Sequence, residues 1–378
     1  VDLGTSISGL QWTIDVYTVV IASFLMMAGA MADRVGRRRV FRVGLVLFSL
    51  GSLSCSLAPT GEALIACRVL QALGGAMLNP VAMSIIVNTF PDPKVRARAI
   101  GMWGAVVGVS MALGPIVGGL LVQHVGWRSI FWLNVPIGIA ALFLTTRYVP
   151  ESRAERARRV DPVGQGLVVV GLGVLTATLI EGPHASWRSA PILAGFAIAI
   201  GAVVALIAYE RRREDPLIDL RFFRSVPFSS ATVLAVLAFA TFNGGLFLSS
   251  LYLQQSRGLE PSVAGACLLP SAIALIVCSP LSGRQVGAGH ARRMLVISGL
   301  AIATSGALLA NLTLATPLPQ LVLAFTALGI GLGSINPPIT NAAASGMPRS
   351  QAGVAGGIAS TSRQGGASLG GAIAGPLA

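Results

Sequence analysis

The sequence predicts an all-α protein whose helices cross a membrane many times. Hydrophobic residues occupy 54% of its 378 positions, charged residues only 11%, and the mean hydropathy is +0.76. A soluble domain carries roughly 25% charged residues. Apolar runs of the ~20 residues that a membrane-spanning helix needs recur along the whole chain. Basic residues, finally, concentrate in every second connection between these runs.

Twelve apolar runs are expected to form the helices, and their bounds should hold to within a few residues. In order they are 12–31, 40–58, 62–90, 98–122, 129–147, 162–180, 191–209, 226–250, 261–281, 293–312, 318–345 and 353–375. Glycine and proline occur within several of them, which membrane helices tolerate better than soluble helices do. All four cysteines lie within apolar runs, where we interpret them as packing residues.

The basic residues predict the orientation. If residues 1–11 lie outside the cell membrane, the outer connections hold only Arg128, Arg188 and Arg257. Apart from Arg68 and Arg363, which lie within apolar runs, every other basic residue lies in an inner connection. This asymmetry follows the positive-inside rule. The net charge of +13 is therefore explained by topology. It does not indicate a nucleic-acid partner, which would require basic residues on one solvated face.

An internal repeat predicts two related halves. The stretch GGAMLNPVAMSIIVN resembles GLGSINPPITNAAAS, which aligns Asn79 with Asn336, and GVSMALGPIVGG aligns with RQGGASLGGAIA. Such repeats predict halves related by an axis along the membrane normal. We expect an N-terminal half at 1–161, two linking helices and a loop at 162–224, and a C-terminal half at 225–378.

The same repeat predicts how many helices the parent fold has. The run at 226–250 has its counterpart before residue 1, and the run at 129–147 has its counterpart after residue 378. The chain is therefore expected to show about 12 of 14 helices, without the first and the last.

A charged hairpin, GAMADRVGRRR, separates the first two apolar runs. Gly29 and Gly36 would permit close backbone approach and a tight turn. Asp33 is expected to cap or pair with positive groups of a neighbouring helix, and Asp92 is one expected partner of the hairpin. The arginines expected to face the cytoplasm include Arg34, Arg37 and Arg38.

Two ionisable residues fall within apolar runs. Arg68 lies in LIACRVLQALGGA, and an arginine inside a membrane segment is costly and marks a functional position that faces the bundle. The alternative is that its side chain extends to the interface. Asp15 falls just inside the membrane, where burial favours the neutral form that suits a proton carrier. An interfacial carboxylate in contact with water is an equal alternative.

A third motif, SMALGPIVGGLL, combines a proline with closely spaced glycines. Proline removes a helix hydrogen bond and glycines let helices touch, so this segment can bend and seal against a facing helix. The alternative is a plain packing face of small residues. The motif residues are Gly114, Pro115, Gly118 and Gly119.

Polar residues in the remaining helices are expected to line a central cavity, because polar groups in lipid-embedded helices turn inward. These residues are Asn243, Tyr252, Gln254, Asn336 and Arg363.

The three motifs resemble those of the major facilitator superfamily, and within it those of the fourteen-helix drug:proton antiporters. Met31, Ala72 and Ser110 depart from the usual residues of the three motifs. The resemblance implies a major facilitator fold of two pseudo-symmetric six-helix halves plus two linking helices. It further implies that the charged hairpin acts as a latch between the halves, that Arg68 serves proton coupling, and that the glycine-proline motif accompanies export. A positive-inside stop signal alone is the alternative for the hairpin.

The expected function is proton-coupled export of small amphipathic compounds, such as drugs or antibiotics, by alternating access across the cell membrane. The partners would be the small-molecule substrate, protons and the bilayer, with no nucleic acid, cofactor or metal, and the protein would be a monomer. The alternatives are a dedicated exporter of one endogenous metabolite, lipid or siderophore, an importer of nutrients, and a nonfunctional truncated fragment. An enzyme is not expected, because the three histidines lie in loops, and the absence of a phosphate loop points to an ion gradient as the energy source.

Overall fold

The computed structural model describes residues 3, 7–90, 92–154, 161–213, 220–345 and 352–375, and the regular structure in these residues is helical. The first group of helices is α1 (Ile7–Val35), α2 (Arg37–Leu57), α3 (Gly61–Thr89), α4 (Pro93–His124) and α5 (Arg128–Tyr148). The middle pair is α6 (Pro162–Ala185) and α7 (Ala190–Glu210). The last group is η1 (Leu220–Arg224), α8 (Val226–Leu251), η2 (Tyr252–Ser256), α9 (Pro261–Cys267), α10 (Leu269–Gly287), α11 (Ala291–Ala310), α12 (Leu318–Ser345) and α13 (Ala352–Ala374).

Local sequence explains several helix ends. Thr60 precedes α3, and its side chain accepts the backbone N–H of Ala63 at 3.2 Å. Asp161 caps α6 in the same way through Gly164. Threonine and aspartate are preferred at this position because they satisfy a backbone donor that the helix leaves unpaired. These caps place the ends of α3 and α6 at the boundaries of the apolar runs.

In the described part of the chain, ten of the twelve predicted membrane helices are confirmed as membrane-spanning by length and hydropathy, and the runs at 98–122 and 353–375 form the helices α4 and α13, which are not among those ten. The run expected as one helix at 261–281 is two helices, α9 and α10, which are separated at Leu268. Pro270 lies in the first turn of α10 and has no N–H to continue the hydrogen-bond pattern of α9, so the helix breaks there.

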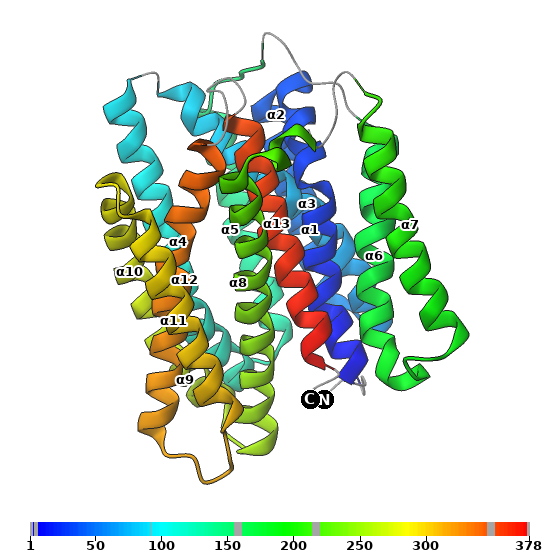
Figure 1. The fold of residues 1–378 in the computed structure, drawn as a ribbon, viewed down its shortest axis with the longest axis vertical. Helices are drawn as coiled ribbons and strands as arrows, with labels where there is room; N and C mark the ends of the chain where they lie inside the picture. Colours follow the sequence, from blue (N-terminus) through cyan, green and yellow to red (C-terminus); the bar gives the residue numbers. More distant parts are fainter. Residues whose placement is uncertain are drawn as a thin grey trace.

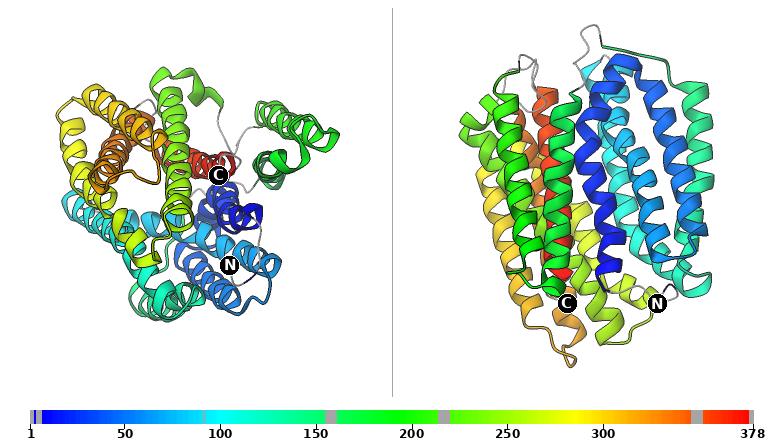
Figure 2. Two further views of the ribbon diagram at one scale, coloured as in Figure 1. Left: turned by 90° about the horizontal axis from the view of Figure 1, so that it is seen from below. Right: turned by 90° about the vertical axis from the view of Figure 1, so that its right-hand side faces the viewer.

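The helices form an elongated bundle in which α1 to α5 pack beside α8 to α13 (Figure 1). The hairpin of α6 and α7 stands at one side, and α6 packs against both α1 and α13 (Figure 2). Thr176 of α6 shares a hydrogen bond of 3.2 Å with Ser368 of α13, and Gln165 of α6 donates to the carbonyl of Ser23 in α1. The boundaries of the two halves and of the linking part stay a prediction.

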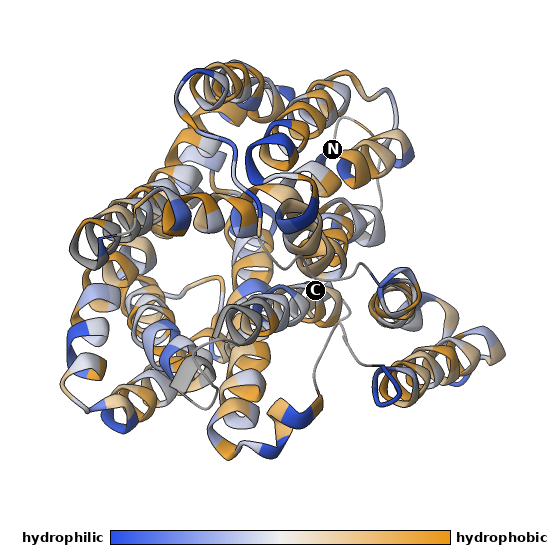
Figure 3. Cartoon of the chain, turned by 90° about the horizontal axis from the view of Figure 1, so that it is seen from above, coloured by the Kyte–Doolittle hydropathy of each residue, from blue (hydrophilic) through white to orange (hydrophobic). Residues whose placement is uncertain are grey.

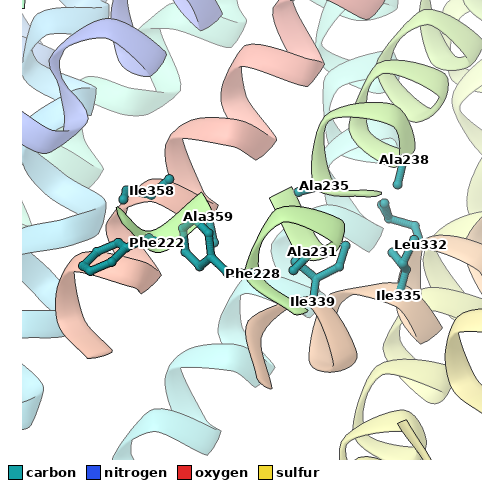
Figure 4. Close-up of a cluster of buried hydrophobic side chains, with 10 residues drawn as sticks. All are labelled: Phe222, Phe228, Ala231, Ala235, Ala238, Leu332, Ile335, Ile339, Ile358 and Ala359. Atoms are coloured by element: carbon teal, nitrogen blue, oxygen red, sulfur yellow. The ribbon is translucent and has the colours of Figure 1, made fainter. Parts of the chain in front are cut away.

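Apolar side chains cover the outside of the bundle as well as its core. Figure 3 shows apolar residues along nearly every helix, viewed end-on. Ile137, Ile139 and Phe143 of α5, for example, are exposed. Such a surface suits contact with lipid. Inside the bundle, a buried apolar cluster joins α8, α12 and α13 (Figure 4) and fixes their spacing.

Candidate functional site

The most extensive contacts between the N-terminal and C-terminal groups of helices lie at two places. One is between α1 and α13, and the other is between α4 and the helices α9 and α10. The start of α1 and the end of α13 lie at the end of the bundle at which both chain ends are found (Figure 1). We call these two contacts the outer seam, because the basic residues predict that this end faces outward.

Helices α4 and α9 meet backbone to backbone. A Cβ added to Gly119 would lie 2.9 Å from the Cα of Ser262, and one added to Gly265 would lie 2.9 Å from the carbonyl carbon of Pro115. Only glycine fits at such distances. Beyond this contact the side chain of Gln123 donates to Glu260 at 2.7 Å. The glycine-proline motif therefore lies on the outer seam.

The glycines of this motif are not equivalent. Gly119 makes the close contact, whereas a Cβ added to Gly114 or Gly118 would meet nothing within 4 Å. Gly118 and Pro115 line a cavity of about 240 Å³ between α4, α8, η2 and α9. Close approach along the whole motif, which the sequence suggested, is therefore limited to one glycine in this conformation.

The other part of the outer seam buries Asp15. Its side chain is only 1% exposed, and one of its oxygens, Oδ2, has no hydrogen-bond partner in the described part of the chain. A Cβ added to Gly371 of α13 would lie 2.9 Å from the carboxyl carbon of Asp15. The carboxyl group is thus enclosed where α1 meets α13, and the interfacial, water-exposed alternative is not what the structure shows.

Gln11 is a contact residue that the sequence analysis did not propose. Its side-chain amide donates to the carbonyl of Gly371 at 3.0 Å, across the same pair of helices. Gln11 lies one helical turn before Asp15 and therefore on the same face of α1. In the sequence, a polar residue one helical turn before a carboxylate, within an apolar run, was the feature that could have predicted this contact.

Arg68 binds α1 from another side. Its Nε donates to the carbonyl of Thr13 at 3.0 Å, its NH1 donates to Gln71 at 2.6 Å, and its guanidinium stacks on the ring of Tyr17 at 4.2 Å. Gln71 in turn donates to Ser52 of α2 at 2.6 Å. The half-buried guanidinium thus has its partners on α1 and α3, inside the bundle.

Arg68 and Asp15 lie on opposite faces of α1. Asp15 is two residues from Thr13, which corresponds to about 200° around the helix. Among the described residues, no carboxylate contacts Arg68. Any part that Arg68 takes in proton coupling is therefore not a direct contact with a carboxylate among the described residues, and α1 lies between Arg68 and Asp15.

The charged hairpin is a compact structure at the inner end of the bundle. Gly36 has φ 128°, a conformation that favours glycine, and a Cβ there would lie 2.7 Å from a carboxylate oxygen of Glu151. Asp33 pairs with Arg37 at 2.7 Å, one turn away across the bend. Arg39 pairs with the same Glu151 at 3.7 Å. The observed contacts of the hairpin thus tie α1 and α2 to the segment after α5, within one half.

Other expectations for the hairpin need correction. Arg37 is 7% exposed and does not face the cytoplasm, because its guanidinium bonds Asp33. Arg34 is exposed as expected, and Arg38 donates from its side chain to the carbonyl of Thr146. Gly29 has open space where a Cβ would lie, so no close approach requires it.

Asp92 was expected to pair with the hairpin. The structure places its carboxylate 3.4 Å from the backbone N–H of Val95, at the start of α4. This contact is a helix cap, and it satisfies a backbone donor of α4.

The residues proposed to line a cavity lie in separate places. Tyr252 borders a cavity of about 590 Å³ between α8, α11 and α12, and donates to the carbonyl of Thr313 at 2.6 Å. Gln254 borders the smaller cavity beside α4. Asn243 is half-buried on α8. Asn336 and Arg363 are brought together, since NH1 of Arg363 donates to the Asn336 side chain at 3.3 Å.

Comparison with known proteins decides the family. Residues 1–166 and 162–371 match the family model described as Major Facilitator Superfamily. The chain belongs to this superfamily. The fold expected from its repeat and motifs is thereby confirmed, and the protein is a multi-pass membrane transporter.

Three superfamily members are similar to this chain over most of their length. The multidrug resistance protein Stp of Mycobacterium tuberculosis is 38% identical over 98% of this chain and 68% of Stp. The tetracenomycin C resistance and export protein of Streptomyces glaucescens is 38% identical over 100% of this chain and 70% of that protein. The methylenomycin A resistance protein of Streptomyces coelicolor is 36% identical over 97% and 77%.

Solved structures agree on the fold. A POT family transporter crystallised with 5-aminolevulinic acid superposes with a TM-score of 0.72, at 16% identity, over 98% of this chain and 82% of that one. A POT family transporter crystallised with a thioalcohol-conjugated peptide gives 0.70, at 16% identity, over 98% and 82%. At this identity the likeness concerns the fold alone.

Proposed function

We propose that this superfamily member exports small amphipathic compounds across the cell membrane in exchange for protons. The names of its relatives support export, since they describe multidrug resistance, methylenomycin A resistance, and tetracenomycin C resistance and export. The proposal follows from what the outer seam would have to do during alternating access: close while the substrate enters from the cytoplasm, and open to release it.

The observation that carries proton coupling is the enclosed carboxyl group of Asp15. A charged carboxylate is costly in a closed, membrane-embedded contact, whereas a neutral one is tolerated. Proton binding at Asp15 therefore favours the closed outer seam, and loss of the proton favours its opening. A group that biases two conformations in this way can exchange a proton for a substrate.

Arg68 has a positioning role in this scheme. It holds the outer part of α1 through the Thr13 carbonyl and the Tyr17 ring, on the face opposite Asp15. An arginine with these contacts fixes the rotation of α1 relative to α3. That rotation decides whether Asp15 points at α13, so removing the guanidinium would uncouple the proton from the seam.

The test is uptake by inverted membrane vesicles that contain the protein. Ethidium serves as a cationic probe and dansylglycine as an anionic probe, each with and without a protonophore, in the wild type, Arg68→Ala and Asp15→Asn. The proposal expects uptake of at least one probe, its collapse with the protonophore, and its loss in both variants. Asp15→Asn should still exchange probe against probe, because exchange needs no proton release.

The contrary outcomes are separable. Protonophore-insensitive uptake would contradict proton coupling. Uptake that needs the proton gradient but persists in Asp15→Asn would show that another group carries the proton. If well-folded protein takes up neither probe, the dedicated exporter of one endogenous metabolite becomes the better explanation.

A further inference from the structure

Arg363 lies near the middle of α13, and its guanidinium has neutral partners. NH1 donates to the Asn336 side chain at 3.3 Å and to the Thr340 hydroxyl at 3.4 Å, both on α12. NH2 donates to the Ser360 hydroxyl at 2.7 Å. Within the described part of the chain no carboxylate pairs with this arginine. Among the described residues, the positive charge is therefore solvated by neutral side chains.

The sequence explains why no carboxylate is near. Between residues 220 and 378 the only acidic residue is Glu260, which binds Gln123 at the outer seam. Asp15 faces Gly371, which lies about 12 Å farther along α13 than Arg363. Arg363 is half-buried, and a cation without a countercharge is unfavourable within a membrane. The C-terminal half thus presents a positive charge that something outside this half must balance.

Exposed polar side chains lie on α12, beside the partners of Arg363, and on α3. Thr340 and Asn341 of α12 are exposed, and so is Asn79 of α3, which the internal repeat pairs with Asn336. Exposed polar side chains are costly against lipid, so we infer that these side chains face water and not lipid. An organic compound entering from the cytoplasm would meet them.

The position of the guanidinium is fixed by packing. Ile335 and Ile339 of α12 and Ile358 and Ala359 of α13 belong to the apolar cluster of Figure 4. The two isoleucines of α12 neighbour Asn336 and Thr340 in sequence, and Ala359 lies about one turn before Arg363. This cluster packs α12 and α13 together with α8. A guanidinium held in place loses less entropy when it binds a ligand than a mobile one does.

We propose that Arg363, together with Asn336 and Thr340, binds the acidic group of the transported compound, and that the preferred substrates are amphipathic organic anions with a carboxylate or similarly acidic group. The planar guanidinium fork matches the two oxygens of a carboxylate. Asn336 and Thr340 can each turn a donor toward the same group. The inference names a substrate class and so rests on the proposed transport function, although binding itself does not require proton coupling.

The test compares two probes that differ by one charge. Dansylglycine carries a carboxylate, and its primary amide is nearly identical in shape but neutral. Binding of each to the protein in lipid nanodiscs is measured by dansyl fluorescence. A charge-assisted pair predicts about tenfold tighter binding of the carboxylate than of the amide. Arg363→Gln should lose this preference without weakening the amide, and Arg363→Lys should keep part of it.

Two further variants make the result specific. Arg292→Gln removes an exposed arginine from the same half and should keep the full preference. Asn336→Asp is nearly isosteric and supplies an internal carboxylate to Arg363, so it should abolish the preference while the arginine stays solvated. The latter variant tests the inference even if Arg363→Gln fails to fold.

The inference is overturned if the wild type binds both probes equally, or if folded Asn336→Asp keeps the preference. Proton-driven ethidium uptake without any carboxylate preference would overturn this inference and leave the proposed function standing. A carboxylate preference that depends on Arg363, without proton-driven uptake, would support the inference and contradict the proposed function.

Discussion

Two glycines of the charged hairpin have opposite surroundings. Gly36 has φ 128° and lies against Glu151, whereas Gly29 lies inside α1 with open space beside its Cα. A side chain at Gly36 would be strained whatever the space, because positive φ is unfavourable for other residues. A side chain at Gly29 would reduce the entropy that the backbone loses on folding. The same substitution should thus act in opposite directions.

Gly36→Ala is expected to lower the free energy of unfolding by about 1–3 kcal/mol, and Gly29→Ala to raise it by about 0.5–1 kcal/mol. The midpoint of thermal unfolding in detergent, followed by tryptophan fluorescence, measures both. A stabilised Gly36→Ala, or two equal shifts, would contradict this account of the hairpin.

Arg68→Lys keeps the charge but should not keep the function. A lysine ammonium cannot stack on Tyr17 while bonding both the Thr13 carbonyl and Gln71 in a fixed geometry. We expect proton-driven uptake in inverted vesicles to fall about tenfold or more, a loss of at least ~1.4 kcal/mol of stabilisation. Arg292→Lys, at an exposed position, is the matched control. Normal uptake by Arg68→Lys would mean that charge alone is required.

At the scale of helices, the contact between α4 and α9 depends on small residues at two positions, Gly119 and Gly265. Because the backbones touch, even one added methyl group would push the two helices apart. The neighbouring Gly118 borders a cavity and has room for one. Adjacent positions in one helix therefore differ sharply in what they tolerate.

Gly119→Ala is expected to reduce proton-driven uptake about tenfold or more, since each tenfold loss corresponds to ~1.4 kcal/mol of the barrier, while Gly118→Ala should transport normally. A reporter, Ala264→Cys, at a position of α9 that is 3% exposed in the closed seam, should react faster with a membrane-impermeant maleimide in the Gly119→Ala background, because the outer seam closes less often. Equal labelling in both backgrounds would show that Gly119 does not control closure.

Hydropathy and charge alone located the helices, because lipid contact demands long apolar segments with satisfied backbones. They did not locate the break at Leu268, although Pro270 was visible, since many membrane helices accommodate proline without breaking. They also gave the positions of Asp15 and Arg68, but not which face of α1 each would meet. That depends on how α3 and α13 pack around α1, which periodicity does not encode.

At the scale of the molecule, the outer seam consists of contacts between side chains far apart in sequence, such as Gln11 with Gly371 and Gln123 with Glu260. Sequence analysis assigned the hairpin a contact between halves, whereas its observed partners, such as Glu151, lie within one half. Charge pairs could not be assigned from sequence because several acidic residues were equally available. The repeat, by contrast, predicted which motifs would occur twice.

A disulfide across the outer seam should stop transport reversibly. In a background with the four native cysteines replaced by alanine, Gln123→Cys with Glu260→Cys is expected to lose uptake on oxidation and regain it on reduction, because the seam can no longer open. Arg39→Cys with Glu151→Cys joins elements of one half and should transport equally in both states. Uptake by the oxidised seam variant would contradict the requirement for opening.

Helix α6 hydrogen-bonds to α1 through Gln165 and to α13 through Thr176. If α1 and α13 separate during transport, α6 can keep its contact with only one of them. The bond between Thr176 and Ser368 links two hydroxyl groups, which can rotate and exchange partners at little cost. The side-chain amide of Gln165, by contrast, donates to a backbone carbonyl of α1. The hairpin of α6 and α7 is thereby suited to move together with α1, while α13 slides along it.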